Sequence, residues 1–148
     1  MQNISPLLIK YGHGKIVNVS TSGVRVPTTF SGIYAISKYG VEGITNSLLY
    51  ELRPFGIQAT SIEPGGMITP MTANSEENMK KIWERMPKEV YDVYYDKISP
   101  SLEYMNSMLD SACSPEKVGK VIVKALHKKK MKIRYMGGNQ VGMMPFLQ

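Results

Sequence analysis

Hydrophobic residues between Ile33 and Leu52 recur at intervals of three and four, the spacing of side chains on one face of an α-helix. The pattern predicts a helix with a single buried stripe, made of Ile33, Ile36, Gly40, Val41, Ile44, Leu48, Leu49 and Leu52. The segment Arg53-Pro54-Phe55-Gly56 follows. It should end the helix, because proline cannot continue the hydrogen-bond ladder and glycine permits a turn.

Two short segments on either side of this helix predict β-strands. Residues 57–62, after the helix stop, form the second of these segments, and residues 15–20 form the first, which is rich in β-branched residues and nearly continuous in its apolar character. This composition is typical of parallel strands that are covered on both faces. Strand, helix and strand in this order form a βαβ unit, whose crossover we expect to be right-handed. The sequence therefore predicts an α/β fold with a parallel sheet.

Polar segments follow both predicted strands. The first strand ends in Ser20-Thr21-Ser22, and the second runs into a segment from Glu63 to Pro70 that contains Pro64-Gly65. Ligands of open parallel sheets bind at the carboxyl ends of the strands, so both segments are placed for function. The sharp turn at Pro64-Gly65 should leave nearby amides free to meet a ligand. A hydroxyl cluster after a strand is also common as a turn or helix cap.

The rest of the chain predicts further helices and one more strand. Residues 1–10 have the pattern of a helix tail. Residues 71–113 are rich in methionine and aromatic residues, and Pro87 and Pro100 should divide them into short helices. Such residues suit an adaptable substrate cavity and ordinary core packing equally well. An amphipathic helix at 118–126 and an alternating strand at 131–136 follow.

Composition narrows the class of protein. A chain of 148 residues with 43% hydrophobic and 20% charged residues is typical of one globular domain. Much of the net charge of +6 comes from Lys128-Lys129-Lys130 and Lys132, which a solvated helix end explains and which leaves a peripheral membrane association open. No basic face with interleaved aromatics can be assembled, so we expect no nucleic-acid partner.

The single cysteine excludes an internal disulfide, and the short apolar runs argue against a transmembrane segment. Cys113 has no second cysteine to pair with, and a structural thiol is the simplest interpretation. No apolar run approaches the roughly 18–20 residues that span a bilayer, so no transmembrane segment is expected. The sequence predicts no metal site.

Tyr34 and Lys38 are the candidate reactive pair. They are four residues apart in the predicted helix, so the phenol and the ammonium should lie one above the other. A tyrosine, with an ordinary pKa near 10, is a poor base at neutral pH, and a nearby ammonium stabilises a phenolate. Tyr11 and Lys15 have the same spacing, but two glycines lie between them. The spacing is therefore weak by itself, and the polar strand ends distinguish the pair.

Three segments in this order, 15–21, 34–38 and 63–65, resemble the short-chain dehydrogenase/reductase family. Tyr39-Gly40-Val41-Glu42, and Trp83 followed by Pro87-Lys88-Glu89-Val90-Tyr91, resemble the branch that contains retinol, hydroxysteroid and D-β-hydroxybutyrate dehydrogenases. The resemblance implies the C-terminal part of a doubly wound Rossmann fold. It also implies one partial domain over 1–148, with a catalytic βαβ core at 1–70, a helical substrate-binding region at 71–113 and a final helix and strand at 114–148.

The resemblance implies an oxidoreductase that transfers hydride between NAD or NADP and the alcohol or carbonyl of a small molecule. The substrate would be a retinoid, a steroid or a 3-hydroxy acid. Tyr34 would exchange the proton and Lys38 would hold the nicotinamide ribose. Thr21 occupies the position of the family's substrate-orienting serine, with Ser22 as the alternative. The cofactor-binding residues would be Tyr34, Lys38, Pro64, Gly65, Met67 and Thr69.

The family's glycine-rich dinucleotide-binding motif is absent from this sequence. We therefore expect an N-terminally truncated chain in which the residues that select NAD or NADP are missing. The alternative is a catalytically inactive short isoform that acts as an interaction or dimerisation module. The resemblance further implies a homodimer or tetramer in the full-length form. It implies an intracellular location, either associated with the endoplasmic reticulum membrane or mitochondrial.

Overall fold

Three parallel strands form the sheet, in the order β1-β2-β3. The computed structural model describes residues 3–25 and 29–138, with the side chains of Met105 and Met108 left out, so part of the predicted region 114–148 lies outside the described residues. The strands are β1 (Gly14–Val19), β2 (Ile57–Pro64) and β3 (Arg134–Gly137). Lys15 pairs with Gln58 and Ser61 with Arg134. The predicted α/β fold with a parallel sheet is confirmed.

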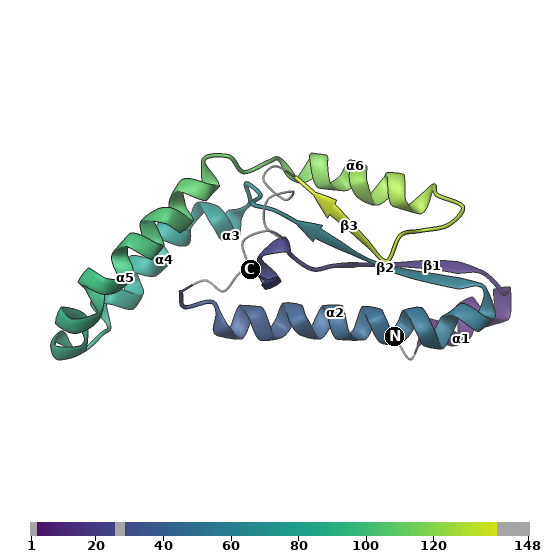
Figure 1. Ribbon diagram of the computed structural model, residues 1–148, viewed down its shortest axis with the longest axis horizontal. Helices are drawn as coiled ribbons and strands as arrows, with labels where there is room; N and C mark the ends of the chain where they lie inside the picture. The colour runs from purple at the N-terminus through teal and green to yellow at the C-terminus, as the bar shows by residue number, and fades with distance from the viewer. Residues whose placement is uncertain (1–2, 26–28, 139–148) are drawn as a thin grey trace.

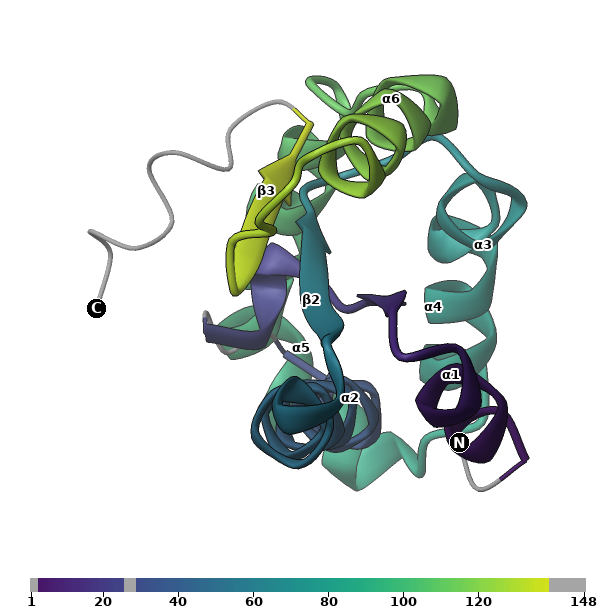
Figure 2. The same cartoon turned by 90° about the vertical axis from the view of Figure 1, so that its right-hand side faces the viewer.

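Helices cover both faces of the sheet (Figures 1 and 2). On one face lie α1 (Ser5–Tyr11) and α2 (Gly32–Leu52). Leu48 and Leu52 of α2 are buried against Ile57 and Ala59 of β2, and Leu8 of α1 packs against the same cluster. On the other face lies α6 (Pro115–Leu126), whose Val118 and Ala125 pack with Ile62 and Cys113. Burial of Cys113 in this second cluster confirms its structural character. Two short 3₁₀ helices, at Ser22–Arg25 and Arg53–Phe55, connect the elements.

The predicted buried stripe of α2 is correct only near the end of the helix, at Leu48 and Leu52. Leu48 and Leu52 are buried, but the side chains of three earlier members are open to solvent, with exposed fractions of 87% for Ile33, 73% for Ile36 and 54% for Ile44. Polar residues meet the sheet instead, with Glu42 and Thr45 buried. The periodicity was right for a helix and wrong for its inward face, because polar groups of the sheet select polar partners on α2.

The region between β2 and α6 forms three helices, α3 (Pro70–Ala73), α4 (Ser75–Glu84) and α5 (Lys88–Leu109). In Figure 1, α4 and α5 extend away from the sheet as a pair, which we call the helical arm. Pro87 precedes α5, as predicted, but Pro100 lies inside α5 and does not end it. An exposed proline removes one backbone hydrogen bond, and the remaining bonds of a helix of 22 residues preserve its course.

The last strand is shorter than the alternating pattern indicates. Only Arg134–Gly137 pairs with β2, so the prediction of a strand from residue 131 was wrong. Side chains of β2 form hydrogen bonds with the backbone of the residues just before β3. Gln58 Oε1 accepts from the Met131 amide at 2.7 Å, and Thr60 Oγ1 donates to the Lys132 carbonyl at 2.8 Å. These contacts hold residues 131–133 in a turn. Among the described residues, none of the helices is long and apolar enough to cross a bilayer.

Candidate functional site

The polar segments that follow β1 and β2 lie side by side. Ser22 Oγ donates to the Pro64 carbonyl oxygen at 2.9 Å, and Thr21 Oγ1 lies 3.4 Å from the same oxygen. Residues 42 or more apart in sequence therefore meet at the edge where both strands end. This is the edge at which ligands bind in open parallel sheets.

Lys38 reaches this edge from the second turn of α2. Its Nζ donates to the carbonyl of Val19, the last residue of β1, at 3.2 Å. The same Nζ lies 5.8 Å from the centre of the Tyr34 ring, within the range of a cation–π contact. Tyr34 itself is 42% exposed, so its hydroxyl can meet a ligand. The structure thus brings the predicted pair together beside the strand ends.

The second pair with the same spacing does not form a site. Lys15 Nζ donates to the carbonyls of Leu126 and Lys128 at 2.6 and 2.8 Å, near the end of α6. Tyr11 ends α1 and is separated from β1 by a glycine with a left-handed backbone, Gly12, at φ 67°. Lys15 therefore binds carbonyl oxygens at the end of α6 and does not pair with Tyr11.

The two candidate hydroxyls differ in their surroundings. Ser22 is buried, and its hydroxyl is committed to the Pro64 carbonyl. Thr21 is half-buried, makes a longer contact with that carbonyl and accepts from the Gly23 amide at 3.2 Å. Thr21 is therefore the hydroxyl that is better placed to meet a ligand, and Ser22 joins the two strand ends.

The loop after β2 offers fewer free amides than predicted. The Gly65 amide donates to the Gly137 carbonyl at 2.8 Å, and the Ile68 amide donates to the Cys113 carbonyl at 3.0 Å. The expectation that Gly65 presents a free amide was wrong, because β2 pairs with β3 up to this point. The amides of Gly66 and Met67 have no hydrogen-bond partner among the described residues. Met67 therefore remains a candidate donor.

Thr69 has a structural contact in addition to its predicted role. Its hydroxyl accepts from the Thr72 amide at 3.3 Å, and its own amide donates to Thr72 Oγ1 at 2.9 Å. This reciprocal arrangement is a capping box at the start of α3. A ligand that binds Thr69 would have to share its hydroxyl with this cap.

A buried polar network lies behind the site and was missed by the sequence prediction. Glu42, one turn after Lys38, accepts from Ser61 Oγ at 2.5 Å and from Arg134 Nε at 3.0 Å. Glu63 binds Arg134 at 3.1 Å and Arg25 Nη2 at 2.9 Å. The network joins α2 to β2, to β3 and to the 3₁₀ helix that contains Arg25. A signal was present in the sequence, because Ser61 and Glu63 are polar residues on either side of Ile62 in a strand of a parallel sheet, which is usually covered on both faces.

The pKa values of the two carboxyls of the network are shifted in opposite directions from the ordinary value of a glutamate. Burial tends to raise the pKa of Glu42, but the hydrogen bonds from Ser61 and Arg134, together with the charge of Arg134, help to outweigh it, and that pKa is lowered below its ordinary value. Burial raises the pKa of Glu63 above its ordinary value, since the charges of Arg25 and Arg134 only partly offset burial and the nearby charge of Glu42. The network therefore keeps Glu42 as its anionic centre.

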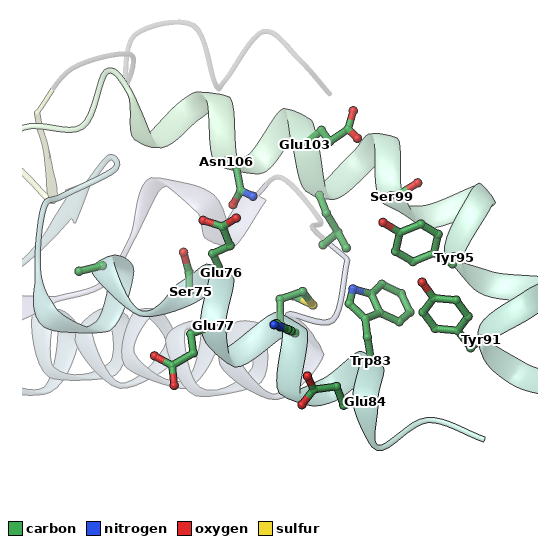
Figure 3. Close-up of a pocket in the computed structure, with 14 residues that line it drawn as sticks. Ser75, Glu76, Glu77, Trp83, Glu84, Tyr91, Tyr95, Ser99, Glu103 and Asn106 are labelled. Carbon is green, nitrogen blue, oxygen red and sulfur yellow. The ribbon is translucent and has the colours of Figure 1, made fainter. Parts of the chain in front are cut away.

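A separate, open pocket of about 830 Å³ lies along the helical arm (Figure 3). Trp83 on α4 faces Tyr91 and Tyr95 on α5, with ring centres 5.8 and 5.4 Å apart in edge-to-face contact. Four acidic residues, Glu76, Glu77, Glu84 and Glu103, also line it. Neither Tyr34 nor Lys38 lines this pocket.

The helical arm is tied to the segment just before α2. Phe30 packs edge-to-face on Trp83 at 5.5 Å, and Thr29 Oγ1 lies 2.8 Å from Ser101 Oγ. Phe30 has a left-handed backbone, with φ 57°, which is uncommon for an aromatic residue. Since Phe30 is four residues before Tyr34, the arm is coupled to the first turn of the helix that carries the reactive pair.

The donors at the strand ends fit the nicotinamide half of a dinucleotide. An ammonium has three donors, so Lys38 can bind a ribose hydroxyl while it holds the Val19 carbonyl. The free Met67 amide can donate to a carboxamide, and the exposed Tyr34 hydroxyl can exchange a proton with an alcohol. No residue of this set supplies the phosphate-binding glycines of a dinucleotide site.

Comparison with known proteins shows the family of this chain. A family model described as short chain dehydrogenase matches residues 1–80. Short-chain dehydrogenase/reductase family 9C member 7 of Mus musculus is 43% identical over 94 residues, which cover 62% of this chain and 29% of that protein. Retinol dehydrogenase 7 of Rattus norvegicus is 40% identical over 117 residues, which cover 76% of this chain and 35% of that protein. The chain thus spans about a third of the length of these relatives.

A solved structure agrees with the fold. A short chain dehydrogenase from Burkholderia cenocepacia, determined in complex with NADP, superposes with a TM-score of 0.66. The match covers 98% of this chain and 47% of that one, at 17% sequence identity. At this identity the likeness supports the arrangement of strands and helices.

Proposed function

Because this chain belongs to the short-chain dehydrogenase/reductase family, we propose that it supplies the catalytic residues of an oxidoreductase acting on an alcohol or carbonyl with a nicotinamide cofactor. The observation that carries the proposal is the position of Lys38, which binds the end of β1 and contacts the Tyr34 ring. The resemblance to a retinol dehydrogenase favours a lipophilic substrate. A retinoid and a steroid both belong to that class, a small 3-hydroxy acid is the alternative, and either NAD or NADP would serve.

Each residue has a distinct task in this proposal. When bound, the nicotinamide ring accepts or donates the hydride. Tyr34 takes the alcohol proton during oxidation and returns it during reduction, and the ammonium of Lys38 stabilises the phenolate that forms. Lys38 also holds the ribose, and Thr21 orients the substrate hydroxyl by a hydrogen bond. The Met67 amide, with Pro64, Gly65 and Thr69 around it, forms the wall at the carboxamide end.

The helical arm would form the substrate-binding region of this enzyme. The aromatic residues around Trp83 provide the apolar surface that a lipophilic alcohol requires. The contact between Phe30 and Trp83 would transmit the position of the arm to Tyr34. In this proposal residues 1–70 perform the chemistry and residues 71–113 select the substrate.

The test is substitution of Tyr34 in the longest natural form of the protein that carries this chain. Retinol, a steroid alcohol and 3-hydroxybutyrate would each be assayed with NAD and with NADP. Tyr34→Phe should lower kcat by about 10²- to 10⁴-fold, because the proton acceptor is lost. Tyr39→Phe is the matched control, since Tyr39 is an exposed tyrosine on the same helix. Equal turnover of the wild type and Tyr34→Phe would exclude the role given to Tyr34.

One observation favours a second candidate function, an interaction or dimerisation module. The outward face of α2 presents Ile33, Ile36 and Ile44, which are all exposed, and Gly40 and Gly43 leave open space between them. A second helix could pack closely on such a face. This surface would also serve the homodimer or tetramer that we propose for the full-length protein.

The two functions predict different behaviour of the chain itself. As a dimerisation module, it should sediment as a dimer, and Ile36→Asp should make it a monomer without loss of helix content. Ile133→Asp provides a control substitution of an exposed isoleucine that does not belong to the outward face of α2. Tight binding of NADH by the 148-residue chain in calorimetry would count against the module and support the enzyme.

A further inference from the structure

Nearly all of the net charge of this protein lies at one edge of the sheet. The segments 10–15, 51–56 and 127–133 each precede a strand, so they meet at the edge where the strands begin. Together they contain seven lysines and arginines and one acid, a formal charge of +6 that equals the net charge of the whole chain. We call this surface the basic edge. It lies at the right-hand end of Figure 1 and faces the viewer in Figure 2.

Helix termini account for only part of this charge. The helices α1, α2 and α6 all end at the basic edge, and each end is equivalent to about half a negative charge. Lys15 satisfies the end of α6 directly. The side chains of Lys128, Lys129, Lys130 and Lys132 are exposed and have no carboxylate partner within the part of the chain that the structure describes. Most of the positive charge is therefore available to a partner.

Apolar side chains are exposed among these cations. Two of them, Tyr11 and Leu126, are the last residues of α1 and α6. The other two, Phe55 and Ile133, lie just before β2 and β3, and each of the four is 39% exposed or more. A groove of about 330 Å³ lies between the end of α2 and the turn before β3, lined by Leu49, Ile57, Ala59, Met131 and Ile133. Arg53 and Lys130 line the same groove. It combines an aliphatic interior with two cations.

We propose that the basic edge docks on the surface of a bilayer that contains anionic phospholipid. The lysines would bind the headgroups, and the exposed apolar side chains would enter the boundary with the acyl chains. The opposite part of the molecule fits this orientation, because residues 70–113 contain eight acids and five bases and would be repelled by such a surface. The aliphatic groove offers no flat surface on which a nucleobase could stack, which favours lipid over nucleic acid.

Flotation of the 148-residue chain with lipid vesicles tests this proposal without any assay of oxidoreductase activity. Vesicles of phosphatidylcholine alone would be compared with vesicles that also contain phosphatidylserine, at low and at high salt. Lipid-bound protein floats in a density gradient, whereas aggregated protein sinks. We expect binding only to the anionic vesicles, weakened by salt, because charge supplies most of the attraction.

Charge-matched variants locate the surface. Replacing Lys128, Lys129 and Lys130 together by glutamine should lower the partition coefficient about a hundredfold, since each lysine near an anionic surface contributes about fivefold. The control replaces Lys81, Lys88 and Lys97 of the helical arm by glutamine, which removes the same charge from α4 and α5. A third variant, Ile133→Ser, should weaken binding while the preference for anionic vesicles remains.

Several results would overturn the proposal. Equal weakening by both triple variants would show that total charge, and not the basic edge, attracts the protein. Equal binding to neutral vesicles would exclude an electrostatic surface. No flotation, together with RNA binding that is lost in the Lys128, Lys129 and Lys130 variant, would assign the edge to nucleic acid. Circular dichroism of each variant shows whether a change in binding arises from unfolding.

Discussion

Nε of Arg134 lies 3.0 Å from Oε2 of Glu42, so the last strand of the sheet is bound directly to the helix that carries Tyr34 and Lys38. Glu42 lies one turn after Lys38, on the side of α2 that faces the sheet. Asn18 Nδ2 donates to Thr45 Oγ1 at 2.8 Å and anchors the next turn of α2 to β1. Polar contacts at successive turns therefore fix the rotation of α2 and aim Lys38 at the strand ends.

The first prediction concerns the stability provided by Glu42. Glu42→Gln keeps the shape of the side chain but removes the negative charge of the carboxylate that accepts hydrogen bonds from Arg134 and Ser61. We expect the free energy of unfolding to fall by about 1 to 3 kcal/mol, the range for losing hydrogen bonds to a buried charged group. Urea denaturation measures this change. Glu51→Gln, an exposed glutamate of the same helix, should change it little, and equal effects of the two would refute the assigned contacts.

The second prediction is the pH dependence of stability. The pKa of Glu42 is lowered in the folded state, so its contribution is present above the ordinary value of 4.5 and is lost as the pH falls through the folded pKa. The pKa of Glu63 is raised, so its contribution is present below 4.5 and is lost as the pH rises through the folded pKa.

Unfolding of the wild type and of the Glu42→Gln and Glu63→Gln variants would be followed from neutral to acid pH. On acidification the wild type should lose stability relative to Glu42→Gln and gain stability relative to Glu63→Gln. Changes of the same sign in both comparisons would contradict the opposite pKa directions.

The third prediction separates Thr21 from Ser22 in the full-length enzyme. Thr21→Ala should lower kcat/KM by about 10²- to 10³-fold, the usual effect of losing one donor to a reacting oxygen. Thr21→Ser should retain activity because it keeps the hydroxyl. Ser22→Ala should act mainly on stability, costing about 1 to 3 kcal/mol, because it removes the shorter of the two hydroxyl contacts to the buried Pro64 carbonyl. Steady-state kinetics and thermal melting of the three variants would show reversed effects if Ser22 were the substrate-binding hydroxyl.

The fourth prediction uses Trp83, the single tryptophan of the chain, as a reporter of the helical arm. Phe30→Ala removes an edge-to-face contact with Trp83 and should destabilise the arm locally by about 0.5 to 1.5 kcal/mol. Trp83 fluorescence should shift to longer wavelength as water reaches the indole, while the urea midpoint of the sheet stays unchanged. Phe55→Ala, at the opposite end of the molecule, should leave the emission where it is. An unshifted spectrum in Phe30→Ala would disprove the contact.

Local pattern was sufficient for the main elements of this protein. The βαβ unit, the helix over 33–52 and the parallel strands followed from periodicity, β-branched composition and the proline–glycine stop, since these signals act over a few neighbouring residues. The same information placed Tyr34 and Lys38 on one face and both polar strand ends at one edge. Pairing of Ser22 with Pro64 and of Lys38 with Val19 agrees with that topology.

Contacts between distant segments were decided by the tertiary structure alone. Which face of α2 turns inward depends on Ser61 and Arg134, which lie 19 and 92 residues from Glu42. The amide of Gly65 is occupied because β3 arrives beside it, and the start of β3 depends on Thr60 and Gln58. A periodic sequence shows that a helix has an apolar face, but whether that face is buried depends on what the rest of the chain places against it.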